Sequence, residues 1–343
     1  MDPFTRAETA GKFRLFSASI RAQLSTVSQA EAVFVLMTQP NEEGTVSTEN
    51  PKVKAKPSAA ERAKITTRVF RQKKKAGEPI TMLTAYDYPT ALAVDRAGID
   101  AILVGDSLGM VVLGYPNTLP VTMEDMLHHC RAVSRGAQFP LLIGDMPFMS
   151  YQVSTEQAVA NAGRFLQEAG MDAVKLEGGI ERADAVRQIV AAGIPVMGHL
   201  GLTPQSVNQL GGFRPQARTS SAAKKLIDDS FALEEAGAFS LVLESVPARL
   251  AEWVSQKLAI PTIGIGAGIG CDGQVLVTHD LLGLFDRFAP KFVKQYASIH
   301  SVMAEAFAGF KADVEARSFP TDEHSVPMKE DQWQALLKEL GES

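Results

Sequence analysis

The stretch AGIDAILVGDS, residues 97–107, has a form that recurs along the chain and decides its fold. A glycine that can end a helix in the left-handed conformation precedes a short apolar run, and the run ends in a polar or ionisable residue. Short, nearly continuous apolar runs are typical of strands that are buried on both faces of a parallel sheet. The other copies are GAQFPLLIGDM (136–146), AGMDAVKLEGG (169–179), AGIPVMGHLG (192–201), AGAFSLVLES (236–245) and, more loosely, EPITMLTAYDY (78–88) and AIPTIGIGAG (259–268).

Helical stretches separate these runs. In STEQAVANAGRFLQEAG (154–170), Ser154 and Gln157 have the spacing of a capping box, and apolar residues follow with a helical period. With GQVLVTHDLLGL (273–284) as a further strand, the β/α units number about eight, which predicts an α/β fold, the (β/α)8 TIM barrel. A doubly wound open sheet is the alternative, and the residues after the barrel are predicted to form appended C-terminal helices.

The N-terminal part of the chain differs in composition from the rest. Residues 39–61 are polar and show no apolar period, which is typical of a disordered linker. Residues 11–28 are basic and rich in serine, a pattern of organelle transit peptides. We expect three parts: an extension that is largely linker or targeting segment (1–64), a catalytic barrel (65–328) and a C-terminal helical tail (329–343). A cytoplasmic location is expected, or the mitochondrial matrix if the extension is a transit peptide.

Charge, hydropathy and cysteine content narrow the classes of function. The net charge of −5 gives no electrostatic footprint for nucleic acid. No apolar run approaches the roughly 20 residues that span a bilayer, so a soluble protein is expected. Cys130 and Cys271 form no CxxC pair, which argues against a disulfide framework or a structural zinc site.

The polar residues at the ends of the apolar runs are the candidate active site. In a TIM barrel the carboxyl ends of the strands form the active face, so these residues converge although they are far apart in sequence. Lys175 and Glu177 are two positions apart and should point to the same side of their strand. For any one of these residues, capping of the following helix is the alternative role. The converging residues are Asp106, Asp145, Glu177, His199 and Glu244.

A cluster of buried carboxylates predicts a cation. Like charges repel and resist burial, so one carboxylate would take up a proton unless a cation were present. Hard oxygen ligands with few nitrogens or sulfurs suit Mg²⁺, which takes its remaining ligands from water and substrate. The natural candidates are Asp106, Asp145 and Glu177.

The lysine in this set indicates the class of substrate. Carboxylates around Lys175 would hold it charged, which argues against a Schiff base and favours contact with a substrate carboxylate. Together with a metal, this chemistry suits an α-keto acid whose adjacent C–H is made acidic. Glu244 or His199 could remove that proton to give an enolate. For His199, a core histidine that bonds to the backbone is the alternative.

The chain resembles the ketopantoate hydroxymethyltransferase family over about residues 65–328. The motifs match in order and without gaps. They are TMLTAYDYPTA (81–91), DAILVGDSLGMVVLGYPNTLPVTMEDMLHHCRAV (100–133), LLIGDMPFMSYQ (141–152), AVKLEGG (173–179), VMGHLGLTPQSVNQLGGFRPQ (196–216), LVLESVP (241–247), TIGIGAGIGCDGQVLVTHDLLGL (262–284) and FPTDEHSVP (319–327).

The resemblance implies transfer of a one-carbon unit from 5,10-methylenetetrahydrofolate to 3-methyl-2-oxobutanoate. The product would be 2-dehydropantoate, for pantothenate and coenzyme A synthesis. It implies Glu244 as the base and a homo-oligomer, typically a decamer. The residues that it implies for Mg²⁺ are Asp106, Asp145 and Glu177. The residues that it implies for keto-acid binding are Asp106, Ser107, Asp145, Lys175 and His199.

The sequence is also compatible with two other functions. The first is a Mg²⁺-dependent lyase that cleaves a C–C or P–C bond next to a keto acid. Some such enzymes use a cysteine in a Lys-Lys-Cys-Gly-His loop, and neither cysteine here has those neighbours. The second is a non-catalytic barrel that forms rings, which would tolerate loss of the charged strand ends.

Overall fold

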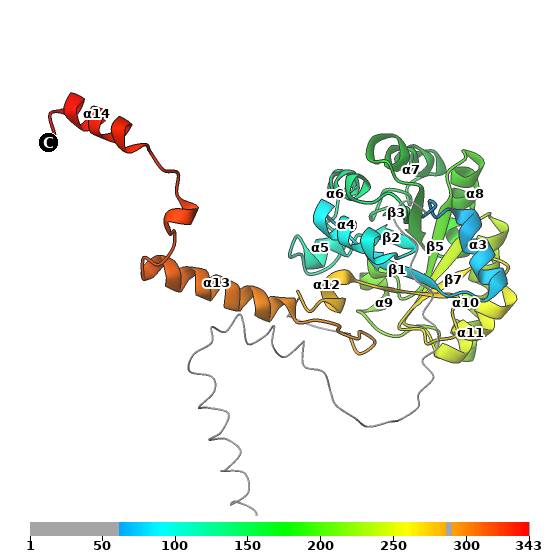
Figure 1. The fold of residues 1–343 in the computed structure, drawn as a ribbon. Helices are drawn as coiled ribbons and strands as arrows, with labels where there is room; N and C mark the ends of the chain where they lie inside the picture. Colours follow the sequence, from blue (N-terminus) through cyan, green and yellow to red (C-terminus); the bar gives the residue numbers. More distant parts are fainter. Residues whose placement is uncertain (1–61, 286–289, 343) are drawn as a thin grey trace, which may run out of the picture. The chain divides into compact units, whose positions relative to one another are not determined.

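A closed parallel barrel forms the centre of the fold. The computed structural model describes residues 62–285 and 290–342, and within them eight strands pair in chain order, with β8 returning to β1 (Figure 1). The predicted TIM barrel is therefore confirmed, and an open sheet is excluded. The strands are β1 (Ile80–Thr84), β2 (Ala101–Val104), β3 (Leu141–Asp145), β4 (Ala173–Glu177), β5 (Val196–Gly201), β6 (Ser240–Glu244), β7 (Thr262–Ile265) and β8 (Gly273–Leu276). The expected linker (39–61) and transit peptide (11–28) lie outside the described residues.

Helices cover the outside of the barrel (Figure 1). Ser154 caps its helix by accepting a hydrogen bond from the backbone of Gln157, and Thr122 forms a complete reciprocal capping box. The α-helices up to the end of the barrel are α3 (Thr67–Ala76), α4 (Tyr88–Ala97), α5 (Leu108–Val111), α6 (Met123–Gly136), α7 (Thr155–Ala169), α8 (Ala183–Ala191), α9 (Val207–Leu210), α10 (Ser220–Glu235), α11 (Ala248–Lys257) and α12 (Thr278–Leu281). Short 3₁₀ turns precede two of them, η2 (Ile180–Arg182) and η3 (Pro204–Ser206).

The left-handed conformation predicted for the glycines that precede the strands is present at most of them and absent at one. Gly98 and Gly170 are left-handed, with φ of 80° and 67°. Gly136 instead remains the last helical residue of α6, and the following Ala137 is extended. A Cβ at Gly136 would lie 2.5 Å from the backbone oxygen of Tyr88. This glycine therefore serves the close packing of α6 against α4 rather than a left-handed turn.

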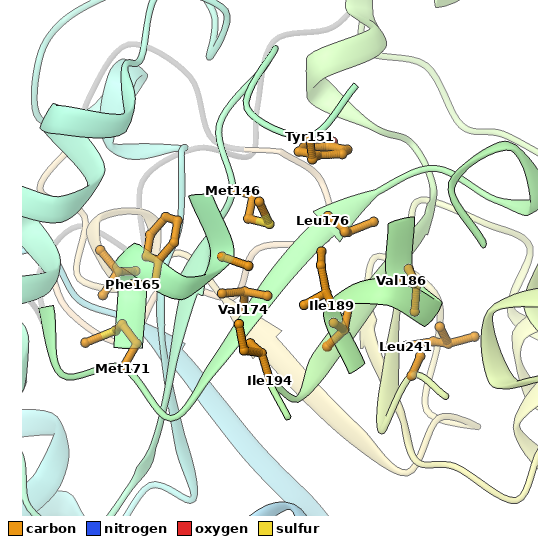
Figure 2. Close-up of a cluster of buried hydrophobic side chains, with 14 of the residues drawn as sticks. Met146, Tyr151, Phe165, Met171, Val174, Leu176, Val186, Ile189, Ile194 and Leu241 are labelled. Carbon is orange, nitrogen blue, oxygen red and sulfur yellow. The ribbon is translucent and has the colours of Figure 1, made fainter. Parts of the chain in front are cut away.

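The core has two parts. The larger lies between the sheet and the helices, and it includes Val174 and Leu176 of β4 and Phe165 of α7 (Figure 2). The smaller lies inside the barrel, where alternate strand residues point inward. Phe70 of α3 is a member of this inner cluster, and its ring meets that of Phe239 edge-on at 5.9 Å.

The inner cluster fixes which side chains reach the active face. In β3, Leu141 and Ile143 point into the barrel, so the next inward position is Asp145. The same alternation applies to β4, β5 and β6, in which Ala173, Met197 and Val242 belong to the inner cluster. The residues that it brings inside there are Lys175, Glu177, His199 and Glu244.

The predicted C-terminal helices are confirmed. They are α13 (Ile299–Glu315) and α14 (Glu330–Leu340), with the 3₁₀ turn η4 (Asp322–His324) between them in the sequence (Figure 1). Neither helix contains a buried residue. No helix in the described part of the chain is both long enough and apolar enough to cross a membrane.

Candidate active site

The carboxyl ends of β2 to β6 bring the predicted polar residues together. Asp106 lies two residues after the end of β2 at Val104, and the others lie within the last three residues of their own strands. Asp106, Asp145, Lys175, Glu177 and His199 are all buried. The side chain of Glu244 is 17% exposed, against 3% for Glu177. Glu244 therefore has access to solvent that the other carboxylates of the cluster lack.

Lys175 and Asp145 form a buried ion pair. The Lys175 ammonium donates hydrogen bonds to both carboxylate oxygens of Asp145, at 2.8 and 2.9 Å. Burial lowers the pKa of Lys175, but Asp145, Glu177 and Asp106 outweigh it and raise that pKa above its ordinary value. The lysine is therefore a charged group and not a nucleophilic amine.

Asp106 is buried next to two other carboxylates, and its pKa is raised. Burial raises its pKa well above the ordinary value, and the nearby Asp145 and Glu177 raise it further, although Lys175 and Gln205 act in the opposite direction. Its backbone N–H also donates to Asp145, at 3.1 Å. A cation bound at this point would relieve the repulsion.

His199 lies between two carboxylates. Its Nδ1 is 3.3 Å from Glu177 Oε1, and its Nε2 is 3.3 Å from Glu244 Oε2. Burial and the charge of Lys175 lower the pKa of His199, but the two glutamates outweigh them and raise it to about 9. The ring is thus an imidazolium at neutral pH. Neither ring nitrogen has hydrogen-bond geometry to an atom of the described residues, so the alternative of a core histidine bonded to backbone is not supported.

Gln205 connects the carboxylates to each other, and the sequence argument missed it. Its side-chain N–H₂ donates to Asp106 Oδ2 at 2.9 Å, and its backbone N–H donates to Glu177 Oε2 at 3.0 Å. The Tyr151 hydroxyl donates to the Gln205 carbonyl oxygen at 2.7 Å and accepts from the Glu177 backbone at 3.1 Å. Figure 2 shows Tyr151 close to Met146 at the end of the core cluster.

Ser107 follows Asp106 in the chain and is partly buried. Its hydroxyl forms a 2.8 Å hydrogen bond with that of the buried Tyr86 from the loop after β1. Burial raises the pKa of Tyr86, so the phenol stays protonated. The pair therefore presents a neutral hydroxyl group beside Asp106.

The donor atoms suit Mg²⁺, although no metal cage is preformed. In the described ranges, no group of three or more His, Cys, Asp and Glu side chains is arranged to hold a metal ion. Lys175 already donates a hydrogen bond to Asp145, and Gln205 donates one to Asp106. Glu177 Oε1 is buried and has no hydrogen-bond partner among the described residues. Mg²⁺ in enzymes is usually held by one or two carboxylates plus water and substrate, which this oxygen set can provide.

A closed parallel barrel with buried charges at the carboxyl ends of its strands defines an enzyme of the (β/α)8 class. The chain belongs to the ketopantoate hydroxymethyltransferase family, whose sequence model matches residues 64–322. A 3-methyl-2-oxobutanoate hydroxymethyltransferase of Syntrophus aciditrophicus (strain SB) is 60% identical over 262 residues, covering 76% of this chain and 96% of that protein. A relative of the same name from Moorella thermoacetica is 58% identical over 266 residues, covering 78% and 99%.

Solved structures of low sequence identity share the fold. A phosphonopyruvate hydrolase superposes with a TM-score of 0.52 at 14% identity, covering 80% of this chain and 94% of the other. Its complex with oxalate and Mg²⁺ gives a TM-score of 0.51 at 15% identity, covering 80% and 98%. At this identity the similarity establishes the barrel and nothing about the reaction.

Proposed function

We propose that the protein transfers a one-carbon unit from 5,10-methylenetetrahydrofolate to C3 of 3-methyl-2-oxobutanoate. The C3–H bond and the two C–N bonds of the methylene bridge break, and a bond forms from C3 to the methylene carbon. Water supplies the hydroxyl group, and its remaining proton and the C3 proton go to N5 and N10, giving 2-dehydropantoate and tetrahydrofolate. This product serves pantothenate and coenzyme A synthesis. The observation that carries the proposal is the family match over the whole barrel, together with relatives of 55–60% identity that bear this name.

The buried cluster holds and orients the keto acid. Mg²⁺ would be held by Asp106, Asp145 and Glu177, and when bound it would polarise the keto carbonyl and so acidify the C3 proton. The ammonium of Lys175 is charged and faces this cluster, so it would bind the substrate carboxylate. Ser107, beside Asp106, would donate or accept a further hydrogen bond.

Glu244 is the base that removes the C3 proton. It is the most exposed carboxylate of the set, so it can pass the proton on to solvent. The imidazolium of His199 lies 3.3 Å from Glu244 and lines the same pocket. A positioned general base contributes about 10²–10⁴-fold to the rate of such a step.

We also propose a homo-oligomer, typically a decamer. The family resemblance supports it, and so do exposed apolar side chains on α13, including Phe307 and Phe310. We propose that residues 65–328 are the catalytic part and that residues 1–64 and 329–343 are appended to it. A cytoplasmic location is supported by the bacterial relatives, and a mitochondrial location by the basic segment 11–28 alone.

Product analysis tests the activity directly. The protein is incubated with 3-methyl-2-oxobutanoate, 5,10-methylenetetrahydrofolate and Mg²⁺, and 2-dehydropantoate is quantified by mass spectrometry. We expect product that requires all three additions and disappears with EDTA. Cleavage of a C–C or P–C bond in a keto acid without folate would instead favour the lyase. No reaction of either kind would favour the non-catalytic barrel.

A further inference from the structure

A cavity opens beside the carboxylate cluster. Its volume is 580 Å³, within the range of about 300–1,000 Å³ that is usual for small-molecule sites. Glu177 and Gln205 form part of its wall, so it borders the carboxylates directly. The rest of the wall comes from loops after β2, β3, β4 and β5 and from α10, whereas Glu244 lies at the end of β6.

A second cavity continues the first. It has a volume of 400 Å³ and extends along the loops after β4 and β5 and the start of α10. The lining residues that the two cavities share are Gly178, Glu181, Ser206, Gln209 and Lys225. The shared wall makes an elongated site, which suits a long ligand better than the compact keto acid.

The first cavity combines apolar, amide and cationic groups in its wall. Leu119 and the 39%-exposed ring of Phe148 supply apolar surface in the first cavity. The exposed amide group of Asn208 in the same cavity can pair with a heterocycle that both donates and accepts hydrogen bonds, whereas the Gln152 amide already accepts from the Tyr151 backbone and donates to Gln205. Lys225 lies where the two cavities join.

Arg182 is the feature that indicates an anionic ligand. Arg182 lines the first cavity and acts electrostatically on the adjacent Glu181, but its guanidinium makes no hydrogen bond or ion pair with any atom in residues 62–285 or 290–342. Lys225 is already paired, with Asp229 at 2.6 Å and more distantly with Glu181 at 3.9 Å. A free guanidinium of this kind is well suited to a carboxylate, which it can hold through two parallel hydrogen bonds.

We propose that these joined cavities bind the folate donor, with its ring system beside Phe148 and its glutamate carboxylates at Arg182 and Lys225. The inference rests on the proposed function and adds the place where its second substrate binds. The donor and the base Glu244 then approach the keto acid from different strands, so neither blocks the other. The ligand is defined by a flat heterocycle at one end and carboxylates at the other.

Replacing the charged side chains of Arg182 and Lys225 tests the proposal. The variants are Arg182→Met, which leaves no described group without a partner, and Arg182→Met/Lys225→Met. For the double variant we expect the KM for 5,10-methylenetetrahydrofolate to rise at least about tenfold, the equivalent of one lost charged hydrogen bond, with kcat within about twofold. The matched controls are Lys224→Met, an exposed lysine paired with Asp228, and Arg187→Met, an exposed arginine paired with Asp184.

A donor without carboxylates separates binding from structural damage. The 5,10-methylene adduct of the amide of tetrahydropteroic acid keeps N5 and N10 but has no glutamate tail, so wild type and variants should use it with equal KM. A wild-type KM for folate in the double variant would overturn the proposed site, as would an equal loss with both donors. If wild type itself makes no 2-dehydropantoate, the proposed function fails instead, and the two failures are thereby distinguished.

Discussion

Replacing Lys175 by methionine should destabilise the protein in a strongly pH-dependent way. The Lys175 side chain is 5% exposed, and its ammonium donates to both oxygens of Asp145, whose side chain is 2% exposed. Without it, the buried carboxylate is left without its cation, and removal of one partner of such a pair costs about 3–5 kcal/mol. The variant can limit this cost by protonating the carboxylate.

The free-energy cost of that protonation determines how much stability Lys175→Met loses. A carboxyl group with an unfolded-state pKa of about 3.9 takes up a proton at pH 7 at a cost of about 4 kcal/mol, at about 1.4 kcal/mol per pH unit. At pH 5 the same step costs about 1.5 kcal/mol. We therefore expect Lys175→Met to lose about 4 kcal/mol of unfolding free energy at pH 7 and less than half of that at pH 5.

Urea unfolding in EDTA at both pH values measures this difference. The control is Lys224→Met, whose exposed pair on one turn of α10 should be worth about 0.5 kcal/mol or less. Mg²⁺ should then stabilise Lys175→Met at pH 7 more than it stabilises wild type, because the cation replaces the lost charge. A loss that is the same at pH 5 and pH 7 would refute the buried ion pair as the source of the effect.

Three further substitutions test separate parts of the structure. Gln205→Leu removes the donor to Asp106 and should weaken Mg²⁺ binding about tenfold or more by calorimetry, since hydrogen bonds to charged groups are worth about 1.5–3 kcal/mol. Gly144→Ala places a methyl group 2.3 Å from a buried phenylalanine ring and should cost about 1–3 kcal/mol, whereas Gly163→Ala meets nothing within 4 Å and should stabilise its helix. Asp280→Asn should stabilise by about 1 kcal/mol at pH 8 and not at pH 4, because burial raises the Asp280 pKa to about 6 and the charged form penalises the fold above that pH.

Each of these has an outcome that contradicts it. Unchanged Mg²⁺ affinity in Gln205→Leu would mean that the amide does not orient the carboxylate. Equal melting temperatures for the two glycine variants would contradict the close packing of β3 on α7. A stabilisation by Asp280→Asn that is already present at pH 4 would mean that burial of the charge is not its cause.

The sequence predicts the barrel because its signals are local and repeated. Each strand is marked by an apolar run with a glycine before it, and the period of two along β4 correctly placed Lys175 and Glu177 on one side. Gly136 was misread because the reason for its small size, the backbone at Tyr88, lies in another helix and leaves no local trace.

The missed part of the candidate site lies in the loops. Gln205 and Tyr151 follow β5 and β3 by several residues, where no period links a position to a direction. Both read as ordinary polar loop residues until the closed barrel brings their loops together over the carboxylates. The sequence shows only that Gln205 and Tyr151 follow strands that end in charged residues. That position indicates that their loops lie near the active face, but it does not indicate which side chains of those loops reach the site.

The central claim is that Glu244 removes the C3 proton of 3-methyl-2-oxobutanoate beside a Mg²⁺-dependent cluster. Proton NMR of the keto acid in D₂O, with protein and Mg²⁺ but without folate, follows this step alone. We predict that the C3 signal disappears with wild type, that EDTA stops the exchange, and that Glu244→Gln slows it at least about hundredfold while calorimetry still detects keto-acid binding. Exchange at the wild-type rate in Glu244→Gln would contradict the account.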